Sequence, residues 1–178
     1  VVAIDGKTAR RSHDSASGKG ALHRVSAWAS EAGLALGQVA TDQKSNEITA
    51  IPKLLAMLDI KGCLVTIDAM GCQRKIAQSI LDAGADYLLN VKGNQERLEE
   101  DIAEEFAQAQ ADAFKHMEHN YFETLEKNRD RIERREYWVT KDIGGLGTLD
   151  KWPKLTAMAM CKRTRTIGGE TSCETHYY

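Results

Sequence analysis

Two aspartates, Asp5 and Asp68, each follow a short apolar run, and this position is suited to metal-dependent chemistry. Residues 1–4 and 64–67 are rich in β-branched side chains, which is typical of buried strands. Two carboxylates that lie close together repel each other unless a cation is present. Ligand sets made only of oxygen suit Mg²⁺ or Mn²⁺. Two such ions about 3.5–4 Å apart can promote phosphodiester cleavage by a water or a 3′-hydroxyl.

Small residues follow both aspartates. Gly6 comes directly after Asp5, and Ala69 and Gly71 come shortly after Asp68, so that a bulky polymer has room to approach. An aspartate after a buried strand can also be a helix cap or a turn residue, and that interpretation stays open for each aspartate taken singly.

The elements that must position these acids begin with three consecutive strands, which we expect to pair antiparallel. We expect the first strand to end at Asp5-Gly6-Lys7, with a polar loop after it. Gly33 can supply a positive φ in the turn between the second and third strands. The expected strands are residues 1–4, 22–30 and 34–41.

Strands and helices then alternate. A helix begins near Ser45, with Pro52 expected near its start, where proline costs least. A second helix follows Asp68 and is expected to end at Gly84. Residues 87–91 form another apolar strand. The order is therefore β-β-β-α-β-α-β, and parallel strands in such units bring their carboxyl ends, here Asp5 and Asp68, to one edge of the sheet.

The rest of the chain predicts one helix and then a β-rich region. Residues 95–110 place Leu98, Ile102 and Phe106 on one face, while acidic residues cover the remainder. Residues 119–125, 132–140 and 155–162 read as strands. Trp28, Trp138 and Trp152 are expected in or near the core.

The bulk composition excludes few functions. Of the 178 residues, 42% are apolar and 28% are charged, and the net charge is −2, so a nucleic-acid partner would have to use a local basic face. No apolar run approaches the roughly 20 residues that span a bilayer, and no signal peptide is visible. The four cysteines form no CxxC pair and are expected to be reduced thiols. A cytoplasmic protein without a membrane partner is the expectation.

The sequence resembles the H-repeat-associated group of insertion-sequence DDE transposases, in order along essentially the whole chain. The stretches that carry the resemblance are Ala3-Ile4-Asp5-Gly6-Lys7-Thr8, Arg10-Arg11-Ser12, Ser26-Ala27-Trp28, Lys44-Ser45-Asn46-Glu47-Ile48, Ile67-Asp68-Ala69-Met70-Gly71-Cys72-Gln73, Val91-Lys92-Gly93-Asn94-Gln95 and Arg131-Ile132-Glu133-x-Arg135.

The resemblance implies an α/β, RNase H-like fold with a mixed sheet flanked by helices and a β-rich insertion in the C-terminal third. We expect the catalytic core to cover residues 1–115 and the β-rich part residues 116–178, with both termini cut from a longer protein. The implied activity is Mg²⁺-dependent cleavage at transposon ends and strand transfer into target DNA. The implied partners are DNA and, in the full-length complex, a second copy.

By their match to the motif, Asp5 and Asp68 are the first two acids of a catalytic triad, and in the complete enzyme they would hold two Mg²⁺ or Mn²⁺ ions. The third acid of the group is a glutamate on a helix after the β-rich insertion, and we expect it beyond Tyr178. Glu133 is the alternative inside the chain, although its surroundings read as a strand and a salt-bridged role is favoured. We therefore expect residues 1–178 alone to be inactive.

Several basic residues are candidates for contacts with DNA phosphates, which position DNA without reading its sequence. The alternative for Arg131 and Arg135 is a solvated strand face, and Lys92 and Asn94 can instead cap the acidic helix. The candidates are Lys7, Arg10, Arg11, Lys92, Asn94, Arg131 and Arg135. Two other functions stay open: a different RNase H-like nuclease, and a non-catalytic remnant or DNA-binding domain of a decayed element.

Overall fold

The computed structural model describes residues 1–8, 23–41 and 47–178, and Arg10 and Arg11 lie outside these described residues. Contacts divide the chain into two compact units, Val1–Asn90 and Val91–Tyr178. Each unit is described by itself below. The boundary of the catalytic core at residue 115 stays a prediction.

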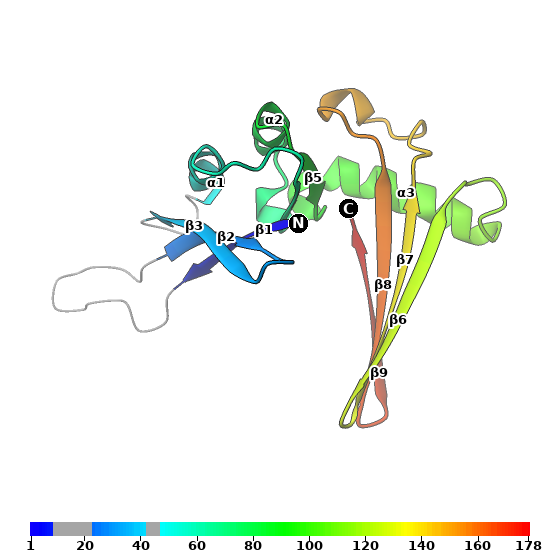
Figure 1. Ribbon diagram of the computed structural model, residues 1–178. Coiled ribbons are helices and arrows are strands. Elements are labelled where there is room, and N and C mark those ends of the chain that lie inside the picture. Colours follow the sequence, from blue (N-terminus) through cyan, green and yellow to red (C-terminus); the bar gives the residue numbers. More distant parts are fainter. Residues whose placement is uncertain (9–22, 42–46) are drawn as a thin grey trace. The chain divides into compact units, whose positions relative to one another are not determined.

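The first unit is built on a five-stranded mixed sheet with the order β3-β2-β1-β4-β5 (Figure 1). The first three strands pair antiparallel, and β4 and β5 continue the sheet in parallel, as predicted. Gly33 has a φ of +63° in the turn between β2 and β3, as expected. The strands are β1 (Val2–Thr8), β2 (His23–Ala29), β3 (Leu34–Thr41), β4 (Leu64–Ile67) and β5 (Asp86–Leu89).

Helices α1 (Glu47–Leu55) and α2 (Arg74–Asp82) cover one face of this sheet. Residues alternate across a strand, so Val2 and Ile4 of β1 face the helices and are buried, whereas Ala3 and Asp5 face away. We call the side turned away from α1 and α2 the outer face.

Two local expectations in this unit were wrong. Strand β1 does not end at Asp5: it continues to Thr8, because β2 pairs with it as far as Thr8↔His23. Pro52 lies at the sixth position of α1 and not in its first turn. The helix tolerates the missing N–H of Pro52 because Ile51, Leu54 and Leu55 bury its apolar face. The helix also ends shortly after the proline, at Leu55.

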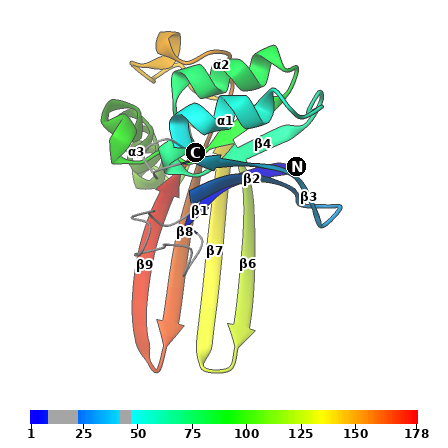
Figure 2. The same cartoon turned by 90° about the vertical axis from the view of Figure 1, so that its left-hand side faces the viewer.

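The second unit begins with helix α3 (Glu96–Ala111), followed by a four-stranded antiparallel sheet with the order β6-β7-β8-β9 (Figure 2). The buried residues of α3 include Leu98, Ile102 and Phe106, as predicted. Phe106 stacks on Tyr177 of β9, with ring centroids 6.5 Å apart. The strands are β6 (Asn120–Asn128), β7 (Arg131–Thr140), β8 (Met158–Ile167) and β9 (Glu170–Tyr177).

The prediction for the last part of the second unit was incomplete. Strand β8 begins three residues later than expected and runs to Ile167, and β9 was not foreseen. Strand β9 is mostly exposed and polar, so it carries no alternation of apolar and polar residues that would identify it. It returns from β8 through Gly168 and Gly169, both of which have positive φ.

The tryptophans also differ from one another. Trp152 is buried, and Trp138 stacks on Phe114 within the second unit. Trp28 is 47% exposed on the outer face of β2, so the expectation of a core or half-core position was wrong for this residue. The predicted fold class is nevertheless confirmed: a mixed α/β sheet with flanking helices, consistent with an RNase H-like fold, and a separate antiparallel sheet in the C-terminal part.

Candidate active site

The register of the parallel strands brings Asp5 and Asp68 to neighbouring positions. The last pair between β1 and β4 is Ile4↔Ile67, and the two aspartates are the next residues on each strand. Neighbouring strands lie about 4.8 Å apart. Ile4 and Ile67 are buried, and the aspartate that follows each of them is exposed. Asp5 and Asp68 therefore lie at neighbouring positions of two adjacent parallel strands, at the point where the pairing of β1 with β4 ends.

Asp68 also acts as a helix cap. It has extended backbone angles and precedes a short 3₁₀ helix, Ala69–Gly71, whose Gly71 N donates a hydrogen bond to Asp68 Oδ1 at 3.4 Å. The cap and the metal-ligand interpretations are compatible, because a carboxylate has about four lone-pair sites and this cap uses one of them.

Asp5 has a cationic neighbour on its own strand. Lys7 Nζ lies 3.3 Å from Asp5 Oδ2, and the two side chains are 74% and 54% exposed, respectively. Residues two apart on a strand share a face, so this pairing follows directly from the continuation of β1 beyond Asp5. The ammonium group partly neutralises the carboxylate.

An open pocket of about 590 Å³ lies on the outer face around these residues. Cross-strand pairs build it: Lys7 lies opposite Arg24, and Asp5 lies opposite Ser26. Trp28 and Gln38 contribute to the lining. We call this feature the outer-face pocket. Sequence reasoning missed Arg24, because its place beside Lys7 depends on the register of the β1–β2 pair.

Comparison with known proteins identifies the family of the chain. Residues 1–166 match the family described as "Transposase DDE domain". The chain belongs to this family. The resemblance to the H-repeat-associated group is also confirmed, and no solved structure matches the chain.

Three relatives show how far the similarity extends. The chain is 43% identical over 173 residues to an "Uncharacterized protein in dhlA 3'region" of Xanthobacter autotrophicus, which covers 97% of this chain and 57% of the relative. It is 51% identical to "Putative transposase YncI" of Escherichia coli O157:H7, over 79% of the chain and 35% of the relative. It is 49% identical to "H repeat-associated putative transposase YhhI" of Escherichia coli K12, over 78% and 36%. This DDE domain thus spans between 35% and 57% of the lengths of these relatives.

The donor atoms of this DDE domain fit a divalent cation of the kind that the family normally uses. Two exposed carboxylates directly follow the last residue pair between the parallel strands β1 and β4, and both offer only oxygen, which suits Mg²⁺ or Mn²⁺. Within residues 1–8, 23–41 and 47–178, no group of three or more histidine, cysteine or acidic residues gathers to hold a metal. Within these ranges, Asp5 and Asp68 thus have no third residue of these types gathered beside them.

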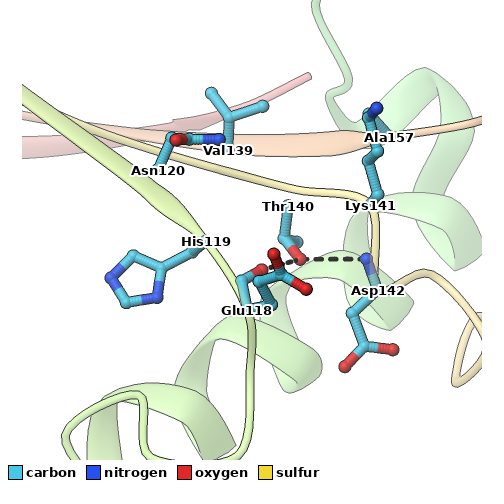
Figure 3. Close-up of a pocket in the computed structure, with 8 residues that line it drawn as sticks. All are labelled: Glu118, His119, Asn120, Val139, Thr140, Lys141, Asp142 and Ala157. Atoms are coloured by element: carbon cyan, nitrogen blue, oxygen red, sulfur yellow. Dashed lines mark hydrogen bonds between the residues drawn. The ribbon is translucent and has the colours of Figure 1, made fainter.

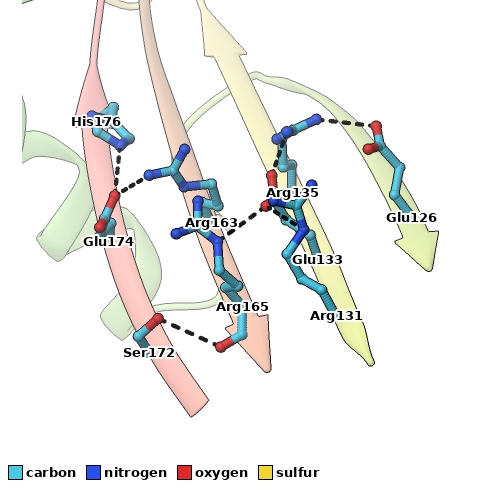
Figure 4. Close-up of polar contacts among 9 residues, drawn as sticks. All are labelled: Glu126, Arg131, Glu133, Arg135, Arg163, Arg165, Ser172, Glu174 and His176. Carbon is cyan, nitrogen blue, oxygen red and sulfur yellow. Dashed lines mark hydrogen bonds and ion pairs between the residues drawn. The ribbon is translucent and has the colours of Figure 1, made fainter. Parts of the chain in front are cut away.

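Glu133 of the DDE domain lies on β7, as its strand-like surroundings predicted, and it is only 2% exposed (Figure 4). Arg165 Nε donates to Glu133 Oε2 at 3.2 Å, Arg135 forms an ion pair with Oε1, and Arg131 Nε lies 3.9 Å from Oε2. Burial raises the pKa of Glu133, but these arginines outweigh it, so that the pKa lies below its usual range.

Glu133 is therefore salt-bridged, as expected, although it is buried and not exposed. Its carboxylate is engaged by cations on both oxygens, which leaves little capacity for a metal ion. Its role as a third acid stays a prediction.

The arginines around Glu133 form a strip on one face of the second sheet. Arg163 pairs with Glu174, and Arg135 also pairs with Glu126, with its Nη1 3.1 Å from Glu126 Oε1 (Figure 4). We call Arg131, Arg135, Arg163 and Arg165 the arginine strip. It carries four cations against the carboxylates of Glu126, Glu133 and Glu174. Lys92 and Asn94 are exposed in the short segment before α3, and Lys92 makes no side-chain cap of that segment.

A second pocket, of about 470 Å³, lies in the second unit (Figure 3). Thr140 Oγ1 donates to the carbonyl of Glu118 at 2.6 Å and accepts from the Asp142 N–H at 2.9 Å. His119 and Asp142 line this pocket but point in different directions, so they do not form a common ligand set. The described part of the DDE domain contains no helix long and apolar enough to cross a membrane.

Proposed function

We propose that this chain is part of the catalytic core of a DNA transposase, which cleaves phosphodiesters at transposon ends and joins them to target DNA. The observation that supports the proposal is the register of β1 and β4, in which Asp5 and Asp68 are the residues directly after the last pair, Ile4↔Ile67. Membership of the DDE family supports it independently.

In this proposal Asp5 and Asp68 are the first two acids of the triad, and their carboxylates hold Mg²⁺ or Mn²⁺. The bound ions would supply charge stabilisation and an activated oxygen nucleophile for phosphodiester chemistry. The cap that Asp68 forms with Gly71 fixes the direction of its carboxylate, and the exposure of Asp5 gives access to a polymer. The third acid belongs to the complete protein beyond Tyr178.

Two surfaces are proposed to hold DNA. Lys7 and Arg24 lie beside Asp5 in the outer-face pocket, where they can contact phosphates close to the scissile bond. The arginine strip offers a second row of cations, and its partly compensated charge suits positioning contacts more than tight binding. Lys92, Asn94, Arg10 and Arg11 stay candidates for the same role. A second copy of the full-length protein would synapse the two transposon ends.

Calorimetric titration with Mn²⁺ tests the metal site. We expect wild-type protein to bind Mn²⁺ and both Asp5→Asn and Asp68→Asn to reduce the affinity by tenfold or more, since each removes one anionic ligand. Asp86→Asn is the matched control. Asp86 is exposed on the same sheet, but it is the first residue of β5 and lies beside Leu64, at the opposite end of the parallel strands from Asp68. Equal affinity in all four proteins would refute the proposal.

A DNA-binding comparison separates a transposase from a general nuclease of the same fold. A transposase is expected to prefer duplexes that carry the terminal repeats of its own element, and the relatives' longer chains make the full-length protein the right sample. A preference for branched DNA or RNA–DNA hybrids over terminal repeats would favour the nuclease.

A further inference from the structure

A polar network of Thr8, His23 and Glu47 lies on the helix-facing side of β1, against Gly6, the residue that follows Asp5. His23 Nδ1 lies 2.7 Å from Thr8 Oγ1, and His23 Nε2 is hydrogen-bonded to Glu47 Oε1. His23 is 2% exposed and Glu47 is 3% exposed. Burying a carboxylate and an imidazole is costly unless both are satisfied, so this pair needs an explanation beyond the packing of an apolar core.

Gly6 links the network to the strand that carries Asp5. A Cβ atom placed on Gly6 would overlap the carboxylate of Glu47. Glu47 therefore packs against the backbone of Gly6, and any larger residue at that position would displace it. Because side chains alternate along β1, Asp5 points to the outer face while Gly6 faces Glu47.

The end of β1 needs this support because it has lost one neighbour. Pairing with β4 stops at Ile4↔Ile67, so that among the strands that the structure describes only β2 pairs with Asp5 to Thr8. The network adds a second attachment from the helix-facing side. Glu47 opens α1, His23 opens β2 and Thr8 closes β1, so three elements are joined at this point.

We propose that Glu47 and His23 are positioning residues for Asp5. They fix the backbone at Gly6 and thereby the direction of the neighbouring carboxylate, without touching the metal or the DNA. This inference rests on the proposed function, because it assigns the network to the same divalent-cation site.

The decisive measurement is Mn²⁺ affinity, made by calorimetry on folded variants, with melting temperatures recorded in parallel. We expect Glu47→Gln, which keeps the shape but removes the charge that strengthens the hydrogen bond to His23, to weaken Mn²⁺ binding by about tenfold, as changes to the groups behind a ligand typically do. Thr8→Val keeps the size of the side chain and removes one hydrogen bond, so a smaller loss in the same direction is expected.

A rescue experiment separates positioning from general stability. Gly6→Ala should weaken Mn²⁺ binding by pushing Glu47 away, and combining it with Glu47→Asp, which shortens the acid, should restore part of the affinity. The control is Thr140→Val, which removes buried hydrogen bonds in the second unit and should lower the melting temperature without changing Mn²⁺ affinity.

The outcomes distinguish the two proposals. Wild-type Mn²⁺ affinity in folded Glu47→Gln and Thr8→Val would overturn the positioning role and leave the metal site intact. If Glu47→Gln does not fold, unchanged affinity in Thr8→Val together with no rescue of Gly6→Ala would overturn it equally. Absence of Asp5-dependent Mn²⁺ binding in the wild type would overturn both proposals.

Discussion

Lys7 and Asp5 form an ion pair on the outer face of β1, with Nζ 3.3 Å from Oδ2. The ammonium group of Lys7 thus lies beside a proposed metal ligand, and a divalent cation would compete with it for the Asp5 carboxylate. Exposed pairs of this kind are worth about 0–1 kcal/mol, so the ammonium group can be displaced when a cation of higher charge arrives.

Replacing Lys7 by glutamine is therefore expected to have opposite effects on two ligands. Mn²⁺ should bind up to about fivefold more tightly, because the competing cation is gone, while DNA should bind more weakly because a phosphate contact is lost. Calorimetry and fluorescence anisotropy measure the two affinities. Weaker Mn²⁺ binding in Lys7→Gln would contradict this account of the pair.

Arg24 should contribute to DNA affinity through charge alone. We expect Arg24→Gln to weaken binding to unrelated duplexes uniformly and to reduce the slope of log affinity against log salt by about 1. Lys75→Gln is the control, because Lys75 is exposed on α2, on the other side of the sheet. The same slope in wild type and Arg24→Gln would remove the outer-face pocket from the DNA path.

Glu133 should stabilise the second unit in a pH-dependent way. Its pKa is lowered in the folded protein, so its contribution is complete above the ordinary glutamate pKa of about 4.3 and is lost as pH falls through the lowered value. Glu133→Gln should reduce the melting temperature by on the order of 5 °C at pH 7, because three arginines lose their common partner.

Thermal unfolding between pH 2 and pH 7 checks this expectation. The difference between wild type and Glu133→Gln should shrink at the acid end, where the wild-type carboxylate is protonated. Glu126→Gln serves as a matched control, because within the described part of the chain Glu126 forms an ion pair only with Arg135 and its side chain is 58% exposed, so little change is expected. A difference that persists unchanged at pH 2 would show that charge is not its cause.

Purified residues 1–178 should not nick DNA in the presence of Mg²⁺. The reason is that the described residues contain no third acid gathered beside Asp5 and Asp68. A supercoiled-plasmid assay measures nicking directly. Robust nicking that is lost in Asp68→Asn would place a third acid inside this chain, and Glu133 would then be the first residue to replace.

The neighbouring positions of Asp5 and Asp68 could be predicted because local rules determine them. An apolar run that ends in an acid, repeated on either side of a helix, implies parallel strands with their ends at one edge, and the register places Asp5 beside Asp68 accordingly. The acidic helix α3 was equally clear, because its apolar residues recur at helical spacing.

What could not be predicted depends on pairing between distant segments. The hydrogen bond between His23 and Glu47 joins residues that are 24 apart in the sequence. No periodic pattern of residues predicts a buried polar pair of this kind. Arg24 reaches the site only through its register with Lys7. Strand β9 was not predicted, because an exposed polar strand is identified from its pairing with β8 and not from its own composition.

The cap formed by Asp68 has a practical consequence for any variant at that position. Asparagine keeps an oxygen that can accept from Gly71 N, and it serves as well as aspartate at the start of a helix. An amide at residue 68 would thus preserve the local backbone while cancelling a full negative charge. Exchanging one oxygen for nitrogen at this residue would thus separate the architecture of the proposed reaction centre from its electrostatics.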